Sequence, residues 1–175
     1  MPIDLNTNFK AINIAVVTIS DTRIKENDTS GDILEKRIKK LGHVLEKRII
    51  IKDDKNKIKD ILKELSNQNN VDCIITTGGT GLTGRDSTTE AVIEIANKII
   101  EGFGELFRQI SYKKIGTSSI QSRALAALVN STYVFCLPGS TSACKDGWDE
   151  ILKYQLDIRH KPCNFIEIMP RLNEK

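Results

Sequence analysis

The chain has 175 residues, of which 39% are hydrophobic and 28% are charged, and its formal net charge is +3 at pH 7. This balance excludes a disordered chain, and the length suits one domain with a single sizeable core. The net charge is too small to indicate a protein that binds nucleic acid, and the basic residues alternate with acids, as on solvated helix faces. We therefore expect a polar N-terminal tail over residues 1–10 and one domain over residues 11–175.

No apolar run approaches the roughly 18 residues that a membrane-spanning helix needs. The start of the sequence has neither an apolar core nor a cleavage signal, so we expect a cytoplasmic protein with no membrane partner. The four cysteines form no Cys-x-x-Cys pair, and the two histidines are isolated, so neither zinc nor a disulfide framework is indicated. Cys73 and Cys136 lie in apolar runs and are expected to be buried.

The first half of the chain alternates between strand and helix patterns. Residues 11–20 form a continuous apolar run rich in β-branched residues, which predicts a buried strand. A polar loop follows, and then a helical spacing of apolar residues that ends at Gly42. Residues 44–51 and 71–77 predict the second and third strands, with a helix of one apolar face between them.

The second half continues this alternation. Apolar spacing predicts four further helices, over residues 87–99, 102–115, 118–129 and 144–156. A fourth strand is predicted over residues 131–137, and an irregular tail beyond about Arg159. The pattern predicts an α/β fold with a mostly parallel, doubly wound sheet and helices on both of its faces.

Four polar loops follow the four predicted strands, with the sequences SDTR, KDD, GGTGLTGRD and PGSTS. In a parallel sheet the carboxyl ends of the strands meet at one edge, and ligands bind beyond that edge. We therefore expect the four loops to form one site.

The third of these loops is rich in glycine. Residues 79–84 spell G-T-G-L-T-G, a formal match to the fingerprint of dinucleotide-binding folds. That fingerprint follows the first strand of its unit, whereas this one follows the third, and no Lys-Ser or Lys-Thr pair closes a P-loop. Both of those interpretations are therefore disfavoured. A glycine-rich turn before a helix still brings backbone N–H groups to an oxyanion.

Asp86 closes the same loop and would by itself repel a phosphate. With Mg²⁺ between them it would attract one, because Mg²⁺ is commonly held by one or two carboxylates and phosphate oxygens. Asp53 or Asp54, on the neighbouring loop, would be the second carboxylate. The alternative is that Asp86 only caps the following helix. Arg85 is the local candidate for a cation on a polyphosphate, with a plain surface arginine as its alternative.

Several segments, taken in order, resemble the molybdopterin-binding MoaB/Mog family: TTGGTGLTGRDSTTEA, EGFGELFR, SRA and LPGST. The resemblance covers residues 12 to about 164, and the closing LDIRHKPCNF is similar to the bacterial MoaB branch. It implies a three-layer α/β fold that assembles as homotrimers, or as homohexamers of two trimers. The apolar stretches GFGELFRQI and ALAALV are candidates for the subunit contact. It also implies a late role in molybdenum cofactor biosynthesis, with other enzymes of that pathway as further partners.

Mog-like members of this family transfer AMP from ATP to the terminal phosphate of molybdopterin with Mg²⁺, and release pyrophosphate. The resemblance implies that Asp53 and Asp86 are catalytic and bind the metal. It implies that the nucleotide binds at the glycine loop next to the candidate cation, at Gly78, Gly79, Thr80, Gly81 and Arg85. It places molybdopterin recognition at the loops after the first and last strands, at Ser20, Asp21, Pro138, Gly139, Ser140 and Thr141.

The intact Arg85–Asp86 pair favours adenylyl transfer over the alternatives. The first alternative is a molybdopterin-binding protein of the same pathway without transferase activity. The second is a structural partner for other enzymes that make the cofactor.

Overall fold

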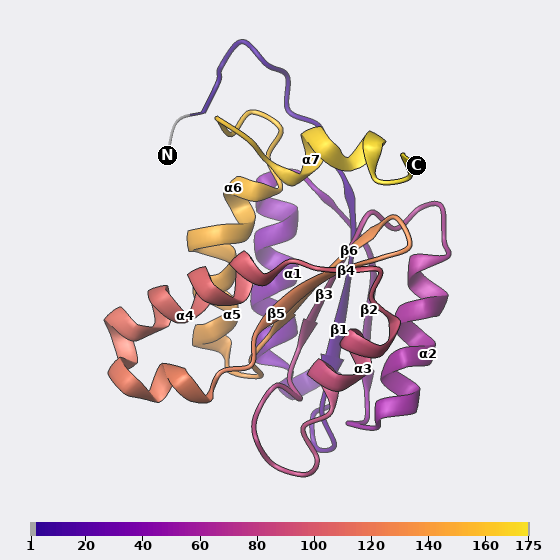
Figure 1. The fold of residues 1–175 in the computed structure, drawn as a ribbon, viewed down its shortest axis with the longest axis vertical. Coiled ribbons are helices and arrows are strands. Elements are labelled where there is room, and N and C mark those ends of the chain that lie inside the picture. Colours follow the sequence, from indigo (N-terminus) through magenta and orange to yellow (C-terminus); the bar gives the residue numbers. More distant parts are fainter. Residues whose placement is uncertain (1–2, 175) are drawn as a thin grey trace.

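The computed structural model describes residues 3–174, and they form a six-stranded sheet between two layers of helices (Figure 1). The sheet order is β2-β1-β3-β6-β5-β4, with β1 Asn13–Ile19, β2 Val44–Ile51, β3 Cys73–Thr77, β4 Lys98–Ile99, β5 Leu125–Val129 and β6 Thr132–Leu137. The strands β2, β1, β3 and β6 are parallel, and β5 and β4 add an antiparallel edge. The predicted three-layer, mostly parallel α/β fold is confirmed.

The helices cover both faces of the sheet. One layer contains α1 Thr29–Leu41, α4 Glu101–Ile115 and α5 Thr141–Gly147, and the other contains α2 Lys55–Ser66 and α3 Thr88–Ile95. The helix α5 continues through a π-helical turn, η3 Trp148–Leu152, into α6 Lys153–Gln155. Shorter turns of helix are η1 Lys25–Asn27, η2 Gly116–Gln121, α7 Phe165–Ile168 and η4 Met169–Arg171. Within residues 3–174, no helix has the length and apolar character to cross a membrane.

The two faces of β1 explain its continuous apolar sequence. Ile14 and Val16 are fully buried in the core beneath α1 and α5, whereas Ala15 and Val17 are buried in the core beneath α2 and α3. A parallel strand that is covered on both faces has no polar side, so its sequence does not alternate. Cys73 and Cys136 are fully buried in the neighbouring strands, as predicted.

The prediction of a helix over residues 118–129 is wrong. Residues 116–121 form the turn η2, and Leu125–Val129 is the strand β5, paired with β6 through a tight turn in which Asn130 has φ 54°. Ala and Leu favour a helix locally, but burial against two layers outweighs that preference. Residues 124–129 are 0–9% exposed within one subunit, so ALAALV is not a subunit contact surface either.

Two further elements differ from the sequence-based expectation. The predicted helix over residues 87–99 ends at Ile95, because Lys98–Ile99 pairs with β5 as the short strand β4. The region beyond Arg159 is not an irregular tail: α7 packs onto the sheet, with Ile166 1% exposed and Phe165 in ring contact with Tyr133 and Phe135. These contacts are between residues far apart in sequence, which local patterns do not reveal.

Candidate functional site

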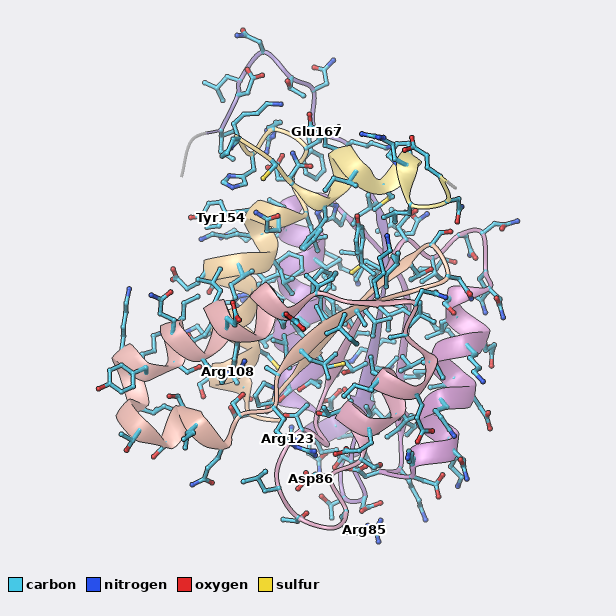
Figure 2. The ribbon with its side chains drawn as sticks, in the orientation of Figure 1. Arg85, Asp86, Arg108, Arg123, Tyr154 and Glu167 are labelled. Carbon is cyan, nitrogen blue, oxygen red and sulfur yellow. The ribbon has the colours of Figure 1, made fainter. Side chains whose placement is uncertain are left out.

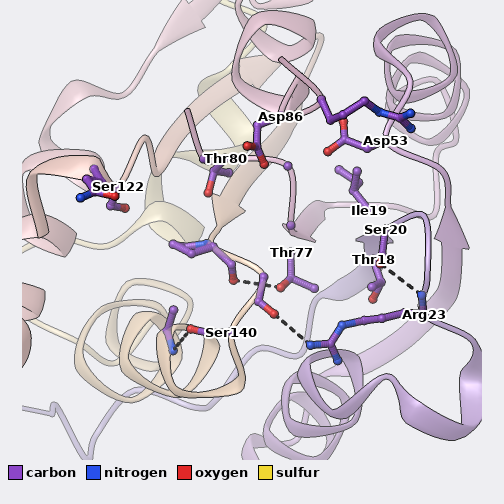
Figure 3. A pocket seen from close by; sticks show the side chains of 18 of the residues that line it. Thr18, Ile19, Ser20, Arg23, Asp53, Thr77, Thr80, Asp86, Ser122 and Ser140 are labelled. Atoms are coloured by element: carbon purple, nitrogen blue, oxygen red, sulfur yellow. Dashed lines mark hydrogen bonds between the residues drawn. The ribbon is translucent and has the colours of Figure 1, made fainter. Parts of the chain in front are cut away.

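A cleft of about 710 Å³ opens at the carboxyl ends of the parallel strands (Figure 3). It is lined by the loops that follow β1, β2, β3 and β6, together with the end of α4. The prediction that four loops gather on one edge is therefore confirmed. The cleft lies next to β1 and β3, between which the winding of the sheet reverses, the usual place for a ligand in such folds.

All but one of the residues predicted to form the site line this cleft: Ser20, Asp21, Asp53, Gly78, Gly79, Thr80, Gly81, Arg85, Asp86, Pro138, Gly139 and Ser140. The exception is Thr141, whose Oγ1 lies 2.7 Å from Oγ1 of Thr29. In the close view, Asp53 and Asp86 lie on one side of the cleft, and Ser140 and Arg23 lie on the other (Figure 3).

The glycine loop needs glycine at its first two positions. Gly78 and Gly79 have φ of 106° and 65°, a region that other residues rarely adopt. A Cβ on Gly78 would collide with the backbone carbonyl oxygen of Ile19, and one on Gly79 with the hydroxyl of Thr88. The loop can therefore pass close to the end of β1 and to the start of α3 only with glycine at these two positions.

The structure separates the roles of the two neighbouring carboxylates after β2. Asp54 caps α2, since its carboxylate accepts a hydrogen bond from the N–H of Lys57 at 2.9 Å. Asp53 turns toward the glycine loop, where its Oδ1 accepts hydrogen bonds from the N–H and hydroxyl of Ser87 at 3.2 and 2.8 Å. Asp53, and not Asp54, is therefore the candidate for the second metal ligand.

Asp86 does not cap α3, so the capping alternative is wrong. The N-cap residue of α3 is Ser87, whereas the carboxylate of Asp86 accepts hydrogen bonds from the N–H and hydroxyl of Thr83 at 2.9 and 2.6 Å. The hydroxyl of Thr83 contributes most to lowering the pKa of Asp86, although partial burial opposes it. The carboxylate is therefore negative at neutral pH.

The donor set fits Mg²⁺ shared with a substrate. Asp53 and Asp86 flank Gly79–Gly81, and within residues 3–174 no hydroxyl or charged side chain donates to Oδ2 of Asp53 or Oδ1 of Asp86. The described residues contain no group of three His, Cys, Asp or Glu residues suited to hold a metal. A cation here would thus need oxygens from a substrate or water, which is how Mg²⁺ is held beside phosphates.

Two arginines supply positive charge to the cleft. Arg85 forms an ion pair with Asp21, with Nη2 2.5 Å from Oδ2, and its side chain is 69% exposed. Arg23, which the sequence analysis did not single out, donates from Nη2 to the carbonyl oxygen of Gly139 at 3.3 Å. Its place in the SDTR loop was a usable clue. The cleft is also lined by residues that were not predicted for it, which come from α4 (Phe107, Ser111 and Ile115), from η2 (Gln121) and from the position after η2 (Ser122). The segments EGFGELFR and SRA, which resemble the family, contain Phe107 and Ser122, whereas the sequence offers no such clue for the other three.

A doubly wound sheet with a glycine loop and two carboxylates near its switch point is typical of α/β proteins that bind phosphorylated ligands. Comparison with known proteins narrows this class. A family described as "Probable molybdopterin binding domain" matches residues 15–158, and the chain belongs to this family. The resemblance to the MoaB/Mog family is thereby confirmed.

Individual relatives agree with this assignment. The "Molybdenum cofactor biosynthesis protein B" of Escherichia coli (strain K12) is 40% identical over 161 residues, which cover 92% of this chain and 95% of that protein. A "Probable molybdopterin adenylyltransferase" of Methanocaldococcus jannaschii is 38% identical over 148 residues, or 81% and 88% of the two chains. A crystal structure of a molybdenum cofactor biosynthesis protein B has a TM-score of 0.85 at 38% identity and covers 95% of this chain and 98% of its own.

Proposed function

We propose that this protein acts in molybdenum cofactor biosynthesis and transfers AMP from Mg-ATP to the terminal phosphate of molybdopterin. The observation that carries the proposal is the pair of carboxylates, Asp53 and Asp86, on either side of a glycine loop in one cleft. The family match and the relative named as an adenylyltransferase support it.

The reaction balances as a displacement at phosphorus. An oxygen of the molybdopterin phosphate bonds to the α-phosphorus of ATP, and the bond from that phosphorus to the bridging oxygen breaks. Pyrophosphate leaves with the electron pair, and the product is a phosphoanhydride between AMP and molybdopterin. Such a reaction needs mainly alignment of the two phosphates and neutralisation of their charge.

The residues of the cleft divide this work between its two sides. The glycine loop presents backbone N–H groups to the polyphosphate, and Arg85 adds a positive charge near it. Asp53 and Asp86 would hold the cation, which when bound would neutralise phosphate charge. No titrating side chain is needed, because the attacking phosphate oxygen is already ionised at neutral pH.

The opposite side of the cleft would take molybdopterin. Ser140 caps α5 through a hydrogen bond from the N–H of Ala143 at 3.2 Å, and the hydroxyl of Ser30 holds the carbonyl of Gly139 at 2.9 Å. The loop Pro138–Ser140 is therefore fixed in place beside Ser20 and Asp21, where it would receive the pterin without a large rearrangement.

The proposal is tested by pyrophosphate release under single-turnover conditions with molybdopterin and Mg-ATP. We expect release that requires all three components. Tight molybdopterin binding with no pyrophosphate would instead select the alternative, a binding protein of the same pathway without transferase activity. The same assay with Mg-GTP establishes the nucleotide preference.

We also propose the setting in which this activity operates. The protein would be cytoplasmic and would form a homotrimer or a homohexamer. Its partners would be molybdopterin, the nucleotide and other enzymes of cofactor synthesis, with no nucleic acid or membrane among them.

A further inference from the structure

Arg123 links three parts of the fold around the glycine loop. Its Nη2 donates a hydrogen bond to the backbone carbonyl oxygen of Asp86 at 2.9 Å, and its Nη1 forms an ion pair with Glu90 of α3. Its own backbone N–H donates to the carbonyl oxygen of Thr80 at 3.3 Å. Arg123 and Asp86 are seen next to each other in Figure 2. The residue belongs to the SRA segment, to which none of the roles above is assigned.

These contacts reach both ends of the loop that contains Asp86. Thr80 lies at its beginning and Asp86 at its end. The side chain of Leu82, between them, is 69% exposed, so it adds little packing to hold the loop. The backbone carbonyl of Arg123 in turn accepts a hydrogen bond from the hydroxyl of Thr89, at 3.2 Å. The first turn of α3 therefore holds the backbone of Arg123 in place, and the hydrogen bonds of Arg123 to Thr80 and Asp86 in turn hold the loop.

The side chain of Arg123 is not available as a direct ligand for phosphate. It is absent from the residues that line the main cleft, and it lies on the outer side of the loop, in a smaller cavity of about 310 Å³ with Glu90 and Lys55. Its two terminal nitrogens are engaged by Glu90 and Asp86, and its side chain is 25% exposed. Any effect on chemistry must therefore pass through the loop.

We propose that Arg123 is a positioning residue, which holds the backbone of Asp86 so that its carboxylate faces Asp53 across the glycine loop. The proposal rests on the proposed function of these two carboxylates. A planar guanidinium donates to a carbonyl oxygen and to a carboxylate from two different nitrogens held in a fixed geometry, which the three N–H groups on the single, rotatable ammonium nitrogen of lysine do not reproduce. A displacement of about 1 Å at a reacting group can cost roughly 100-fold in rate.

The first test compares Arg123→Lys with Arg108→Lys. Arg108 is a matched control, because it donates to the carbonyls of Ser122 and Ala124, on both sides of Arg123, but does not contact the glycine loop. Amide hydrogen exchange is measured over residues 80–87 in the whole protein without substrate. We expect exchange there to be at least about tenfold faster in Arg123→Lys, the scale of a local opening made easier by one lost contact, and unchanged in Arg108→Lys.

The second test measures pyrophosphate release by the same variants at varied Mg²⁺. For Arg123→Lys we expect a rate lower by about 10- to 100-fold and a higher Mg²⁺ concentration at half-maximal rate, with the KM for molybdopterin unchanged. A merely structural loss would lower the amount of active protein without moving the Mg²⁺ dependence. Arg108→Lys should behave as the wild type.

Several outcomes would overturn the inference. Equal hydrogen exchange over residues 80–87 in Arg123→Lys and Arg108→Lys, or an equal loss of rate in both, would show that Arg123 does not position the loop. If Arg123→Lys does not fold, Glu90→Gln replaces it, since this variant keeps the arginine and removes its ion-pair partner, and exchange over residues 80–87 must again rise. If the wild type releases no pyrophosphate, the proposed function fails, while hydrogen exchange still decides the positioning role.

Discussion

Adjacent aspartates in this chain have unequal roles that depend on where each side chain points. The carboxylate of Asp54 accepts a hydrogen bond from the first turn of α2. The carboxylate of Asp53 accepts one from Ser87 at the start of α3 through one oxygen, and its other oxygen lies toward the glycine loop. Asp86 likewise bonds backward to Thr83 and leaves the capping position to Ser87. Two of the three carboxylates thus converge on one loop, although all three occur in sequence contexts typical of helix caps.

Asp86→Asn is expected to separate binding from transfer. Asparagine keeps the size of the side chain and an oxygen for Thr83, so the loop should persist, but the charge that holds a cation is lost. We expect the AMP transfer rate to fall by roughly 100-fold or more, while molybdopterin binding persists. Asp54→Asn is the control, since asparagine caps helices about as well and the rate should not change. Equal rates in the two variants would remove Asp86 from the mechanism.

His43 is expected to make the protein less stable in acid. Burial lowers its pKa from 6.5 to about 4, although the carbonyl of Leu156 and the charge of Asp157 partly oppose this. As the pH falls through this window, the unfolded chain binds a proton that the folded protein excludes, so the free energy of unfolding decreases. The loss should reach about 2–3 kcal/mol by pH 4. Urea unfolding of wild type and His43→Gln at several pH values measures it, and parallel curves would exclude His43 as the cause.

At the scale of elements, the terminal segments complete the core at the end of the sheet away from the cleft. The segment before β1 returns to the C-terminal region, where the N–H of Asp4 donates to the carbonyl of Arg159 at 2.8 Å and the ring of Phe9 contacts His43. The helix α7 lies at the same end of the sheet (Figure 1), and the ring of Phe165 contacts those of Tyr133 and Phe135 in β6. The boundary between a tail over residues 1–10 and the domain stays a prediction, but residues 3–10 are not detached from the fold.

The packing of α7 predicts different effects at two nearby isoleucines. Ile166 is 1% exposed and Ile168 is 46% exposed. Ile166→Ala should lower the free energy of unfolding by about 2–4 kcal/mol, through lost burial and a cavity. Ile168→Ala should change it by about 0.5 kcal/mol or less. Denaturant unfolding compares the two, and a similar small effect at both positions would mean that α7 does not contribute to the core in solution.

At the scale of the whole molecule, one face next to the β4 edge carries unusual apolar exposure. Ile120 is 83% exposed, Ile93 54% and Ile99 41%, and all three line a shallow cavity of about 570 Å³ beside α4. Exposed apolar residues that gather in this way are typical of an interaction surface. The predicted contact segment GFGELFRQI lines the same cavity through Gly104, Glu105 and Arg108 of α4.

We predict a closed homo-oligomer whose subunit number is a multiple of three, with this face at the contact. Light scattering on the eluted protein measures the mass. The double variant Ile99→Glu with Ile120→Glu should shift the mass to that of the monomer, because it would bury two unpaired charges. Ile168→Glu, on the exposed side of α7, should leave the mass unchanged. A monomer in the wild type at micromolar concentration would contradict the prediction.

The sequence by itself determined the strands β1, β2, β3 and β6 and the loops that follow them. The buried strands β1, β3 and β6 are largely apolar runs, whereas the edge strand β2 also carries charged residues, and each of the four is followed by a polar or glycine-rich loop. The sequence also determined the family, and with it twelve residues that line one cleft. Only the tertiary structure decided that Leu125–Val129 is a strand, since its helix-forming residues take that form by pairing with β6. The same holds for α7, and for Arg123 beside Asp86, 37 residues apart. Contacts of this kind depend on burial and pairing between distant segments, which no local pattern records.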